Sequence, residues 1–256
     1  MSEFRYNPLS KTWVLISEVR AKRPQNHLEA KSCPFCPGNE QLTPPEIMRL
    51  PWPGENWQTR VVPNKFNVLA IELQLNRLQI GTYLKENGVG AHEVIIDHPH
   101  PDHRHPAEMH TAEWLMLLKT IKMRMEDLVK DKRLKYPVLF KNHGPSAGAT
   151  IEHPHWQLIV LPIVPQRIEI ALDASCEFFQ KNSVCLLCQI IGDEIKNDKR
   201  LVWQNDKFIV WLPYAARFPY ELTLAPKFHY HRFEWLNHSQ LENLAEVFPK
   251  ILKNLR

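Results

Sequence analysis

The chain contains one ordered set of sequence features twice, and this repeat constrains its fold more than any other feature. Each copy has a Cys-x-x-Cys pair, an Arg with apolar neighbours, an Asn and a Lys-Phe, a Glu between apolar residues, a His and a helical pattern. In the first copy these segments are CPFC (33–36), RVVPNKFNVLA (60–70), HEVIID (92–97) and a histidine cluster. In the second they are CLLC (185–188), RLVWQNDKFIVWLP (200–213), YELTLAP (220–226) and His229. Agreement in this order predicts a duplicated structural unit.

The first copy has the patterns of several strands and one long helix. RVVPNKF (60–66) and HEVIID are short and β-branched and are bounded by Pro, Gly or Asn, which is typical of strands. Residues 107–130 place large apolar side chains at helical spacing with charges between them, which predicts an amphipathic helix. These side chains are Trp114, Leu117, Leu118, Ile121, Met125 and Leu128. YPVLFKN (136–142) and HWQLIVLP (155–162) follow as two more expected strands.

The second copy ends at its helix, SQLENLAEVFPKILKNLR (239–256), and so lacks the final pair of strands. Strands and helices that do not follow a regular βαβ alternation predict an α+β fold, with antiparallel sheets flanked by helices. We therefore expect a complete unit at residues 1–170, and a second unit at 171–256 that is incomplete at its C-terminal end.

Composition argues against several classes of function. With 44% hydrophobic and 23% charged residues, the 256-residue chain suits a soluble globular protein. Its net charge of +4 suits an anionic small substrate and is too small to indicate nucleic-acid binding. No apolar stretch reaches the roughly 18 residues of a membrane helix, and the first residues do not resemble a signal peptide. We therefore expect a cytoplasmic protein that binds neither nucleic acid nor membrane.

The five cysteines form two Cys-x-x-Cys pairs and the single Cys176. In a chain without an export signal, such pairs indicate metal binding or redox chemistry rather than disulfides. A redox pair of the thioredoxin type should open a helix, whereas Cys33 and Cys36 lie in a proline-rich segment, so metal binding is favoured. A zinc site needs about four ligands, and the 13 histidines can supply the others.

The stretch GATIEHPHWQLIVLP (148–162) places His153, His155 and Gln157 at alternate positions where a strand is expected to begin. Side chains at alternate positions of a strand lie on the same face. Pro154 suits the start or edge of a strand, and the glycine-bearing loop before it allows backbone amides to approach an anion. These features favour phosphate chemistry, with a neutral imidazole as nucleophile and glutamine holding the oxygens. The alternative is a surface strand whose histidines serve no reaction.

Six blocks of the sequence, in order, resemble those of the galactose-1-phosphate uridylyltransferase family. They are YNPLSKTWVLISEVRAKRP, CPFCPGNE, RVVPNKF, HEVII, FKNHGPSAGATIEHPHWQL and RFPYELTLAPKFH. This family belongs to the nucleotide-transferring branch of the histidine-triad superfamily, and ADP-glucose phosphorylases share the blocks. The resemblance implies duplicated histidine-triad units, a homodimer, and substrates that are a nucleotide sugar and a sugar phosphate.

The resemblance implies a role for each residue of the H-P-H-x-Q motif. His155 is expected to attack phosphorus and accept the nucleoside monophosphate, while Gln157 holds a phosphate oxygen. His153 matches a ligand of a structural zinc ion, with Cys33 and Cys36 as two further ligands.

The fourth zinc ligand should come from the loop DHPHPDHRHP (97–106), which departs from the Pro-x-His pattern of the family. His103 fits that pattern if two residues are inserted, and we prefer it. His100 fits if one residue is deleted. The second copy has a further set that resembles a second zinc site of some relatives and that the sequence leaves open: Cys185, Cys188 and His229.

Six other residues match substrate-binding positions of the family: Arg20, Arg23, Asn64, Phe66, Asn142 and Thr150. The arginines, Asn142 and Thr150 match residues around the phosphates, whereas Asn64 and Phe66 match residues that contact the nucleoside. Lys65 stands where the family often has an Asp that binds the ribose, so the sequence leaves the preferred base and sugar open.

Two classes of function follow from the motifs and the resemblance. The first is a nucleotidyltransferase of the UDP-glucose–hexose-1-phosphate uridylyltransferase type, acting through a covalent nucleotidyl-His155. Its enzymatic alternative is a phosphorylase or hydrolase of ADP-sugars or dinucleotides in the same superfamily. The non-enzymatic alternative is a degenerate nucleotide-binding scaffold, which the shortened second copy motivates.

Overall fold

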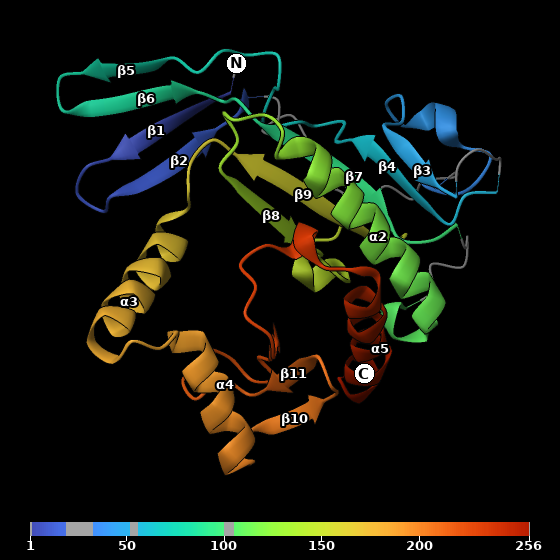
Figure 1. Ribbon diagram of the computed structural model, residues 1–256. Helices are drawn as coiled ribbons and strands as arrows, with labels where there is room; N and C mark the ends of the chain where they lie inside the picture. Colours follow the sequence, from blue (N-terminus) through green and yellow to red (C-terminus); the bar gives the residue numbers. More distant parts are fainter. Residues whose placement is uncertain (1, 19–32, 52–55, 100–104, 256) are drawn as a thin grey trace. The chain divides into compact units, whose positions relative to one another are not determined.

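The computed structural model describes residues 2–18, 33–51, 56–99 and 105–255 (Figure 1). The chain divides into two compact units, Met1–Arg104 with Thr120–Ile168, and His105–Lys119 with Glu169–Arg256. Every pairing between the named strands is antiparallel, and helices accompany the sheets. The predicted α+β class with antiparallel sheets is confirmed. Among the helices of the described residues, none has both the length and the apolar character that crossing a membrane requires.

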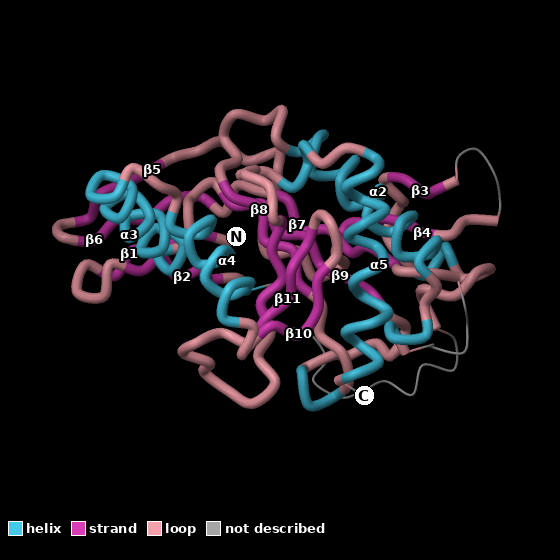
Figure 2. Tube along the Cα trace, turned by 60° about the horizontal axis from the view of Figure 1, so that its bottom comes forward, coloured by secondary structure: helices cyan, strands magenta, loops and turns pink. Residues whose placement is uncertain are grey.

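A five-stranded sheet with the order β3-β4-β7-β9-β8 forms the centre of the first unit. Its strands are β3 (Met48–Leu50), β4 (Thr59–Pro63), β7 (Ala91–Ile96), β9 (His155–Leu161) and β8 (Tyr136–Phe140). Figure 2 shows β7, β8 and β9 side by side. Four of the five strands confirm those expected from the sequence, and β3 is additional. On the inner strand β9, His155 pairs with Ile96 and Gln157 pairs with Val94.

All six residues of β7 are buried, although two of them are polar. Buried polar groups need hydrogen-bonding partners. Glu93 accepts hydrogen bonds from Nε and Nη2 of Arg124, at 2.9 and 2.7 Å. Arg124 lies on α2 (Thr111–Leu128), which is the helix predicted within residues 107–130. Most of the side chains expected to face the core are buried, while Leu128 is half-buried: Trp114, Leu117, Leu118, Ile121 and Met125.

A second, four-stranded sheet of the first unit was not expected from the sequence. It has the order β2-β1-β6-β5, from β2 (Thr12–Ile16), β1 (Glu3–Asn7), β6 (Tyr83–Asn87) and β5 (Arg77–Ile80). One face of it packs against the C-terminal part of β9, where Phe4, Val68 and Leu69 form a cluster with Ile159 and Leu161. Burial of this cluster stabilises the end of β9 that lies away from the H-P-H motif.

Among the described residues that follow Ile168, the second unit contains a three-stranded sheet, preceded by helices α3 and α4 and followed by helix α5. Helix α3 (Gln166–Asn182) leads into the unit, and it is followed by α4 (Leu186–Asn197), β10 (Leu201–Gln204), β11 (Phe208–Trp211), β12 (Thr223–Pro226) and α5 (His238–Asn254). Ile191 of α4 packs on Ile209, Trp211 and Ala225 of the sheet. Helix α5 confirms the helix expected at 239–256, and a capping box of Asn237 and Gln240 fixes its start.

The two copies of the sequence repeat have their strands and helices in the same order, but the residues matched in the sequence do not form corresponding strands. In each copy a Cys pair precedes three antiparallel strands, β3-β4-β7 or β10-β11-β12, and then a histidine. A short 3-10 helix and a long α-helix follow, Pro106–Glu108 with α2 and Phe233–Trp235 with α5. The middle strand of the second copy is β11, so β11 corresponds to β4. The sequence comparison matched the start of residues 60–70, which forms β4, with the start of residues 200–213, which forms β10. By its place in the sheet, β4 instead corresponds to β11 (Phe208–Trp211), so that comparison is out of register.

Candidate active site and metal centre

Three predicted metal ligands converge in the first unit. Nδ1 of His153 lies 3.4 Å from Sγ of Cys33 and 3.6 Å from Sγ of Cys36. On the other side of the ring, Nε2 of His153 lies 2.8 Å from the carbonyl oxygen of His98. A carbonyl can only accept, so Nε2 carries the hydrogen and Nδ1 presents its lone pair to the two sulfurs. A histidine whose far nitrogen donates to a carbonyl has the arrangement that orients metal ligands.

The electrostatics of these thiols also suit a cation. Burial, with a smaller contribution from Cys33, raises the pKa of the Cys36 thiol to about 12. A divalent metal ion would offset that cost, because it favours the thiolate form. The ligand atoms of Cys33, Cys36 and His153 lie within 4.8 Å of one another, so the donor set fits zinc. His103 and His100, the two candidates for the fourth ligand, lie outside the described residues.

His155 is held in one tautomer by its own backbone neighbour. Its Nδ1 lies 2.9 Å from the carbonyl oxygen of His153, so Nδ1 carries a hydrogen and donates it. In the neutral ring, the lone pair then resides on Nε2. The ring of Phe35 stands edge-on to His155, with ring centroids 5.2 Å apart. The imidazole is therefore oriented from two sides, with a nucleophilic nitrogen at Nε2.

Five of the predicted active-site residues line one pocket of about 620 Å³ that opens to solvent: Asn64, Phe66, Thr150, His155 and Gln157. Asn142 lies beside the glycine loop, because its Nδ2 is 3.9 Å from the position that a Cβ on Gly148 would take. Arg20 and Arg23 lie outside the described residues.

The alternation expected along the H-P-H-x-Q motif holds only within the strand. Strand β9 begins at His155, so His155 and Gln157 face the same pocket. His153 precedes the strand and its fully buried ring is directed at the thiols instead. The prediction that all three side chains share one strand face is wrong for His153. Pro154, which has no N–H to donate to the sheet, separates His153 from the first residue of β9.

The glycine loop before the motif takes its shape from two left-handed residues. Gly144 and Gly148 have φ angles of +79° and +81°, which residues with a Cβ rarely adopt. Inside the loop, the N–H groups of Ala147 and Ala149 donate to the carbonyl of Gly144, both at 3.2 Å. These two amides stabilise the loop itself, so they are not available to a phosphate as the sequence suggested.

Comparisons with known proteins identify the family of the chain. The family model of the N-terminal domain of galactose-1-phosphate uridyl transferase matches residues 1–165. The chain belongs to this family. An ADP-glucose phosphorylase from Arabidopsis thaliana is 31% identical over 99% of the chain and 74% of its own length. A galactose-1-phosphate uridylyltransferase from Thermotoga maritima is 30% identical over the same shares.

Two solved structures have a similar fold. A uridylyltransferase structure superposes with a TM-score of 0.81 at 27% identity, covering 96% of this chain and 73% of that one. The crystal structure of the ADP-glucose phosphorylase from Arabidopsis thaliana with bound ADP-glucose gives a TM-score of 0.77 at 29% identity. It covers 100% of this chain and 77% of that one.

Two buried residues of this family member support the H-P-H motif and were not predicted from the sequence. Nζ of Lys141 forms an ion pair with Oδ2 of Asp97 at 2.6 Å, and the side chains are only 10% and 0% exposed. The same Nζ lies 3.4 Å from the carbonyl oxygen of His155, and the backbone N–H of Asp97 donates to Pro154 at 3.2 Å. Asp97 and Lys141 thus hold the backbone on both sides of His155. Their only sequence signal is that each follows an apolar run.

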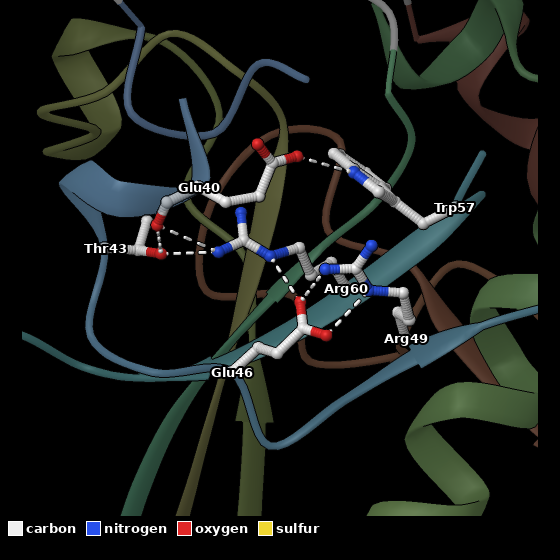
Figure 3. A network of polar contacts seen from close by, with 6 residues as sticks. All are labelled: Glu40, Thr43, Glu46, Arg49, Trp57 and Arg60. Atoms are coloured by element: carbon white, nitrogen blue, oxygen red, sulfur yellow. Dashed lines mark hydrogen bonds and ion pairs between the residues drawn. The ribbon is translucent and has the colours of Figure 1, made fainter. Parts of the chain in front are cut away.

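A polar network supports the wall of the pocket that Leu42, Thr43 and Pro44 form (Figure 3). Nε of the buried Arg60 on β4 donates to Oε2 of Glu46 at 2.9 Å, and its Nη2 contacts Thr43. Other members extend the network: Arg49 donates to Glu46 at 2.6 Å, and Trp57 donates to Glu40 at 3.1 Å. The network connects the loop after the CPFC motif to the central sheet.

The second unit has a similar but more exposed group of metal-type side chains. Sγ of Cys188 lies 3.3 Å from Nδ1 of His229, and Cys185 completes a set within 4.8 Å. Cys185 directly precedes α4. A hydrogen bond from the backbone N–H of Cys188 holds the pKa of the Cys185 thiol below its usual value. Burial raises the pKa of the Cys188 thiol. The fold thus brings together the three residues of the second possible metal site, and among the described residues they offer three ligand atoms.

Proposed function

We propose that the protein transfers a nucleoside monophosphate from a nucleotide sugar to a sugar 1-phosphate through a covalent nucleotidyl-His155. The observation that carries this proposal is the hydrogen bond from Nδ1 of His155 to the carbonyl of His153, which leaves Nε2 as the nucleophile in the pocket. The family membership supports the same reaction class.

The chemistry proceeds in two displacements at one phosphorus atom. Nε2 of His155 attacks the α-phosphorus, a P–N bond forms, and the bond to the bridging oxygen breaks, so the electron pair leaves with the sugar 1-phosphate. The ring becomes positively charged, and the carbonyl of His153 stabilises that charge through Nδ1–H. A phosphate oxygen of the second sugar 1-phosphate then attacks phosphorus, and the P–N bond breaks to restore the neutral imidazole.

The rest of the pocket suits a nucleotide. Phe66 is half-buried in the lining, so one part of its ring can stack on a base. Asn64 and Thr150 supply polar groups in the same pocket, and Gln157 stands two residues from the nucleophile on the same strand face. Roles for Asn142, Arg20 and Arg23 at the phosphates stay predictions.

We also propose that Cys33, Cys36 and His153 hold a structural zinc ion, with His103 as the fourth ligand. The lone pair of His153 and the two convergent thiols support this assignment. Zinc would stabilise the fold and would take no part in the displacement at phosphorus. A homodimer, as the resemblance implies, is part of the same proposal.

A second reaction is favoured by one observation, the similarity to an ADP-glucose phosphorylase over nearly the whole chain. In that case inorganic phosphate would take the nucleotide from His155 in the second displacement. The two activities share the first step and differ in the base and in the acceptor.

Mass spectrometry of the intact protein, after incubation with UDP-glucose or with ADP-glucose, tests the proposal. We expect a mass increase equal to one UMP or one AMP, at an acid-labile and base-stable bond. His155→Ala should abolish the adduct while zinc content is retained, whereas the exposed His110→Ala should label normally. Full labelling of His155→Ala, or an unlabelled parent with both substrates, would contradict the proposal. Product analysis with galactose 1-phosphate or inorganic phosphate then identifies the acceptor.

A further inference from the structure

A buried histidine on the neighbouring strand contacts the glutamine of the H-P-H-x-Q motif. His92, on β7, is only 3% exposed. Its Nε2 lies 3.1 Å from Oε1 of Gln157 and 3.0 Å from Nδ2 of Asn64. Nδ2 of Asn64 is in turn 3.4 Å from Oε1 of Gln157, so the three polar groups form a triangle. Nothing in the reaction proposed above uses His92.

The orientation of Asn64 within this triangle is fixed by the backbone. Its Oδ1 accepts a hydrogen bond from the N–H of Phe66 at 2.9 Å, so the group that faces His92 and Gln157 is the Nδ2 amide. The backbone N–H of Asn64 also donates to the carbonyl of His92 at 2.9 Å. Asn64 is therefore a donor toward the other two side chains.

Two hydrogen assignments are then possible for His92. If Nε2 carries the lone pair, it accepts from Asn64 but faces the lone pairs of Gln157 Oε1 at 3.1 Å, which is repulsive. Reversal of the Gln157 amide would relieve that contact, but it would turn the carbonyl oxygen toward the pocket, where it repels phosphate oxygens. If Nε2 carries the hydrogen, His92 and Asn64 both donate to Oε1 of Gln157, and the 3.0 Å contact between Nε2 and Nδ2 is one between two donors that share this acceptor. The NH₂ group on the other branch of the Gln157 amide is then the one directed away from them.

We propose that His92 is a positioning residue: its Nε2–H holds the carbonyl oxygen of Gln157, so that the NH₂ group of Gln157 is the one offered to the phosphoryl group at His155. This inference rests on the proposed function. The three histidines near the motif then have distinct tasks: His153 and His92 both carry their hydrogen on Nε2, whereas His155 carries it on Nδ1. His153 presents Nδ1 to the metal, His155 presents Nε2 to phosphorus, and His92 donates from Nε2 to Gln157.

The effect on rate follows from the charge on the transferring group. Negative charge on the phosphoryl oxygens is stabilised by donors placed before the reaction begins, and loss of one such donor typically slows a reaction by about a hundredfold or more. Without His92, only the longer contact from Asn64, at 3.4 Å, holds the carbonyl oxygen of Gln157, so the amide can expose either branch more readily. The NH₂ group then faces the phosphate only part of the time, so we expect a smaller loss than the removal of Gln157 itself produces.

The test measures the single-turnover rate of nucleotide transfer to His155 with the nucleotide sugar that labels the parent. We expect His92→Phe, which keeps the ring volume, to slow labelling by about tenfold or more, and Gln157→Ala to slow it further. His92→Gln retains an N–H donor near the position of Nε2 and should restore much of the rate. The buried neighbour Ile95→Val, on the same strand, should label as the parent does.

A double-mutant cycle separates positioning from a structural role. If His92 acts through Gln157, His92→Phe should have little further effect in a Gln157→Ala protein. Independent, multiplying effects of the two substitutions would overturn the positioning role, and so would parent-like labelling of His92→Phe. Both results leave the proposed function intact, because the parent is still labelled at His155. An unlabelled parent would overturn the proposed function and this inference together.

Discussion

The carbonyl oxygen of His153 accepts a hydrogen bond from Nδ1 of His155, 2.9 Å away, so one peptide group connects the proposed metal centre to the proposed nucleophile. The ring of His153 is fixed by the two thiols on one side and by the carbonyl of His98 on the other. Because the ring and the carbonyl belong to one residue, an ion that holds the ring also limits the movement of the carbonyl. We therefore expect the proposed structural metal and the proposed chemistry at His155 to be coupled without direct contact.

Removal of zinc should therefore affect both stability and labelling. We expect Cys33→Ser, or treatment of the parent with a chelator, to lower the melting temperature, because structural zinc contributes folding free energy. Labelling of His155 should slow in the same samples. Metal analysis and thermal unfolding measure the first effect, and mass spectrometry the second. Cys176→Ser, which changes an exposed cysteine outside both Cys-x-x-Cys pairs, is the matched control and should behave as the parent does. Protein purified without chelator that contains no zinc would contradict the assignment.

The elements that the sequence predicted are those with a strong local pattern. Helix α2 and strands β4, β7, β8 and β9 have long periodic or β-branched runs. In the sheet β2-β1-β6-β5, which was missed, the strands β1, β5 and β6 mix polar and apolar residues. Its pairing also joins distant segments, such as Glu3 with Asn87, which no local pattern reveals.

The candidate site shows the same limit. The metal ligands and the pocket residues were accessible because they lie in motifs, and the resemblance supplied their roles. The residues that support them could not be predicted, because their contacts depend on which residues of neighbouring strands are paired. His92 meets Gln157 across a separation of 65 residues, and Lys141 meets Asp97 across 44. In sequence, each of these residues looks like an ordinary neighbour of an apolar run.

The role of Phe66 in binding the base can be tested directly. Phe66→Ala should weaken binding of UMP or AMP by about tenfold or more, because stacking on an aromatic ring contributes about 1–3 kcal/mol per base. The melting temperature of the free protein should change little, since the ring is only half-buried. Isothermal titration calorimetry measures the affinity. Phe179→Ala removes an exposed ring outside the pocket and should leave the affinity unchanged. Equal affinity of Phe66→Ala and the parent would place the base elsewhere.

The ion pair between Lys141 and Asp97 should contribute strongly to stability, because it is buried. Lys141→Met leaves the Asp97 carboxylate without its cation, and breaking such a pair by removing one partner typically costs about 3–5 kcal/mol. Adding Asp97→Asn should recover part of that loss, since the uncompensated charge disappears. Urea unfolding of the three proteins measures the free energies. Lys85→Met, which breaks a more exposed pair with Glu3, should cost at most about 1 kcal/mol. A double variant no more stable than Lys141→Met would exclude the charge as the cause.

The network at the pocket wall predicts a dependence of stability on pH (Figure 3). Hydrogen bonds from Arg49, and then from Arg60, hold the pKa of the Glu46 carboxyl below its usual 4.5. A carboxyl with a lower pKa in the folded state stabilises that state above the unfolded pKa, and the contribution disappears as the pH falls through the folded pKa. Glu46→Gln removes the charge at every pH. At neutral pH we expect this variant to be less stable than the parent by on the order of 1–3 kcal/mol.

The difference between the parent and Glu46→Gln should stay constant at neutral pH and shrink once the pH falls below 4.5, the ordinary pKa of the carboxyl. Urea unfolding at a series of pH values measures it. Glu126→Gln, on the exposed side of α2, is the control and should change the free energy of unfolding by less than about 0.5 kcal/mol. A difference that is the same from about pH 3 to about pH 7 would show that the amide disrupts the shape of the network. A difference that shrinks in acid would show instead that the carboxylate charge holds Arg60 and the pocket wall in place.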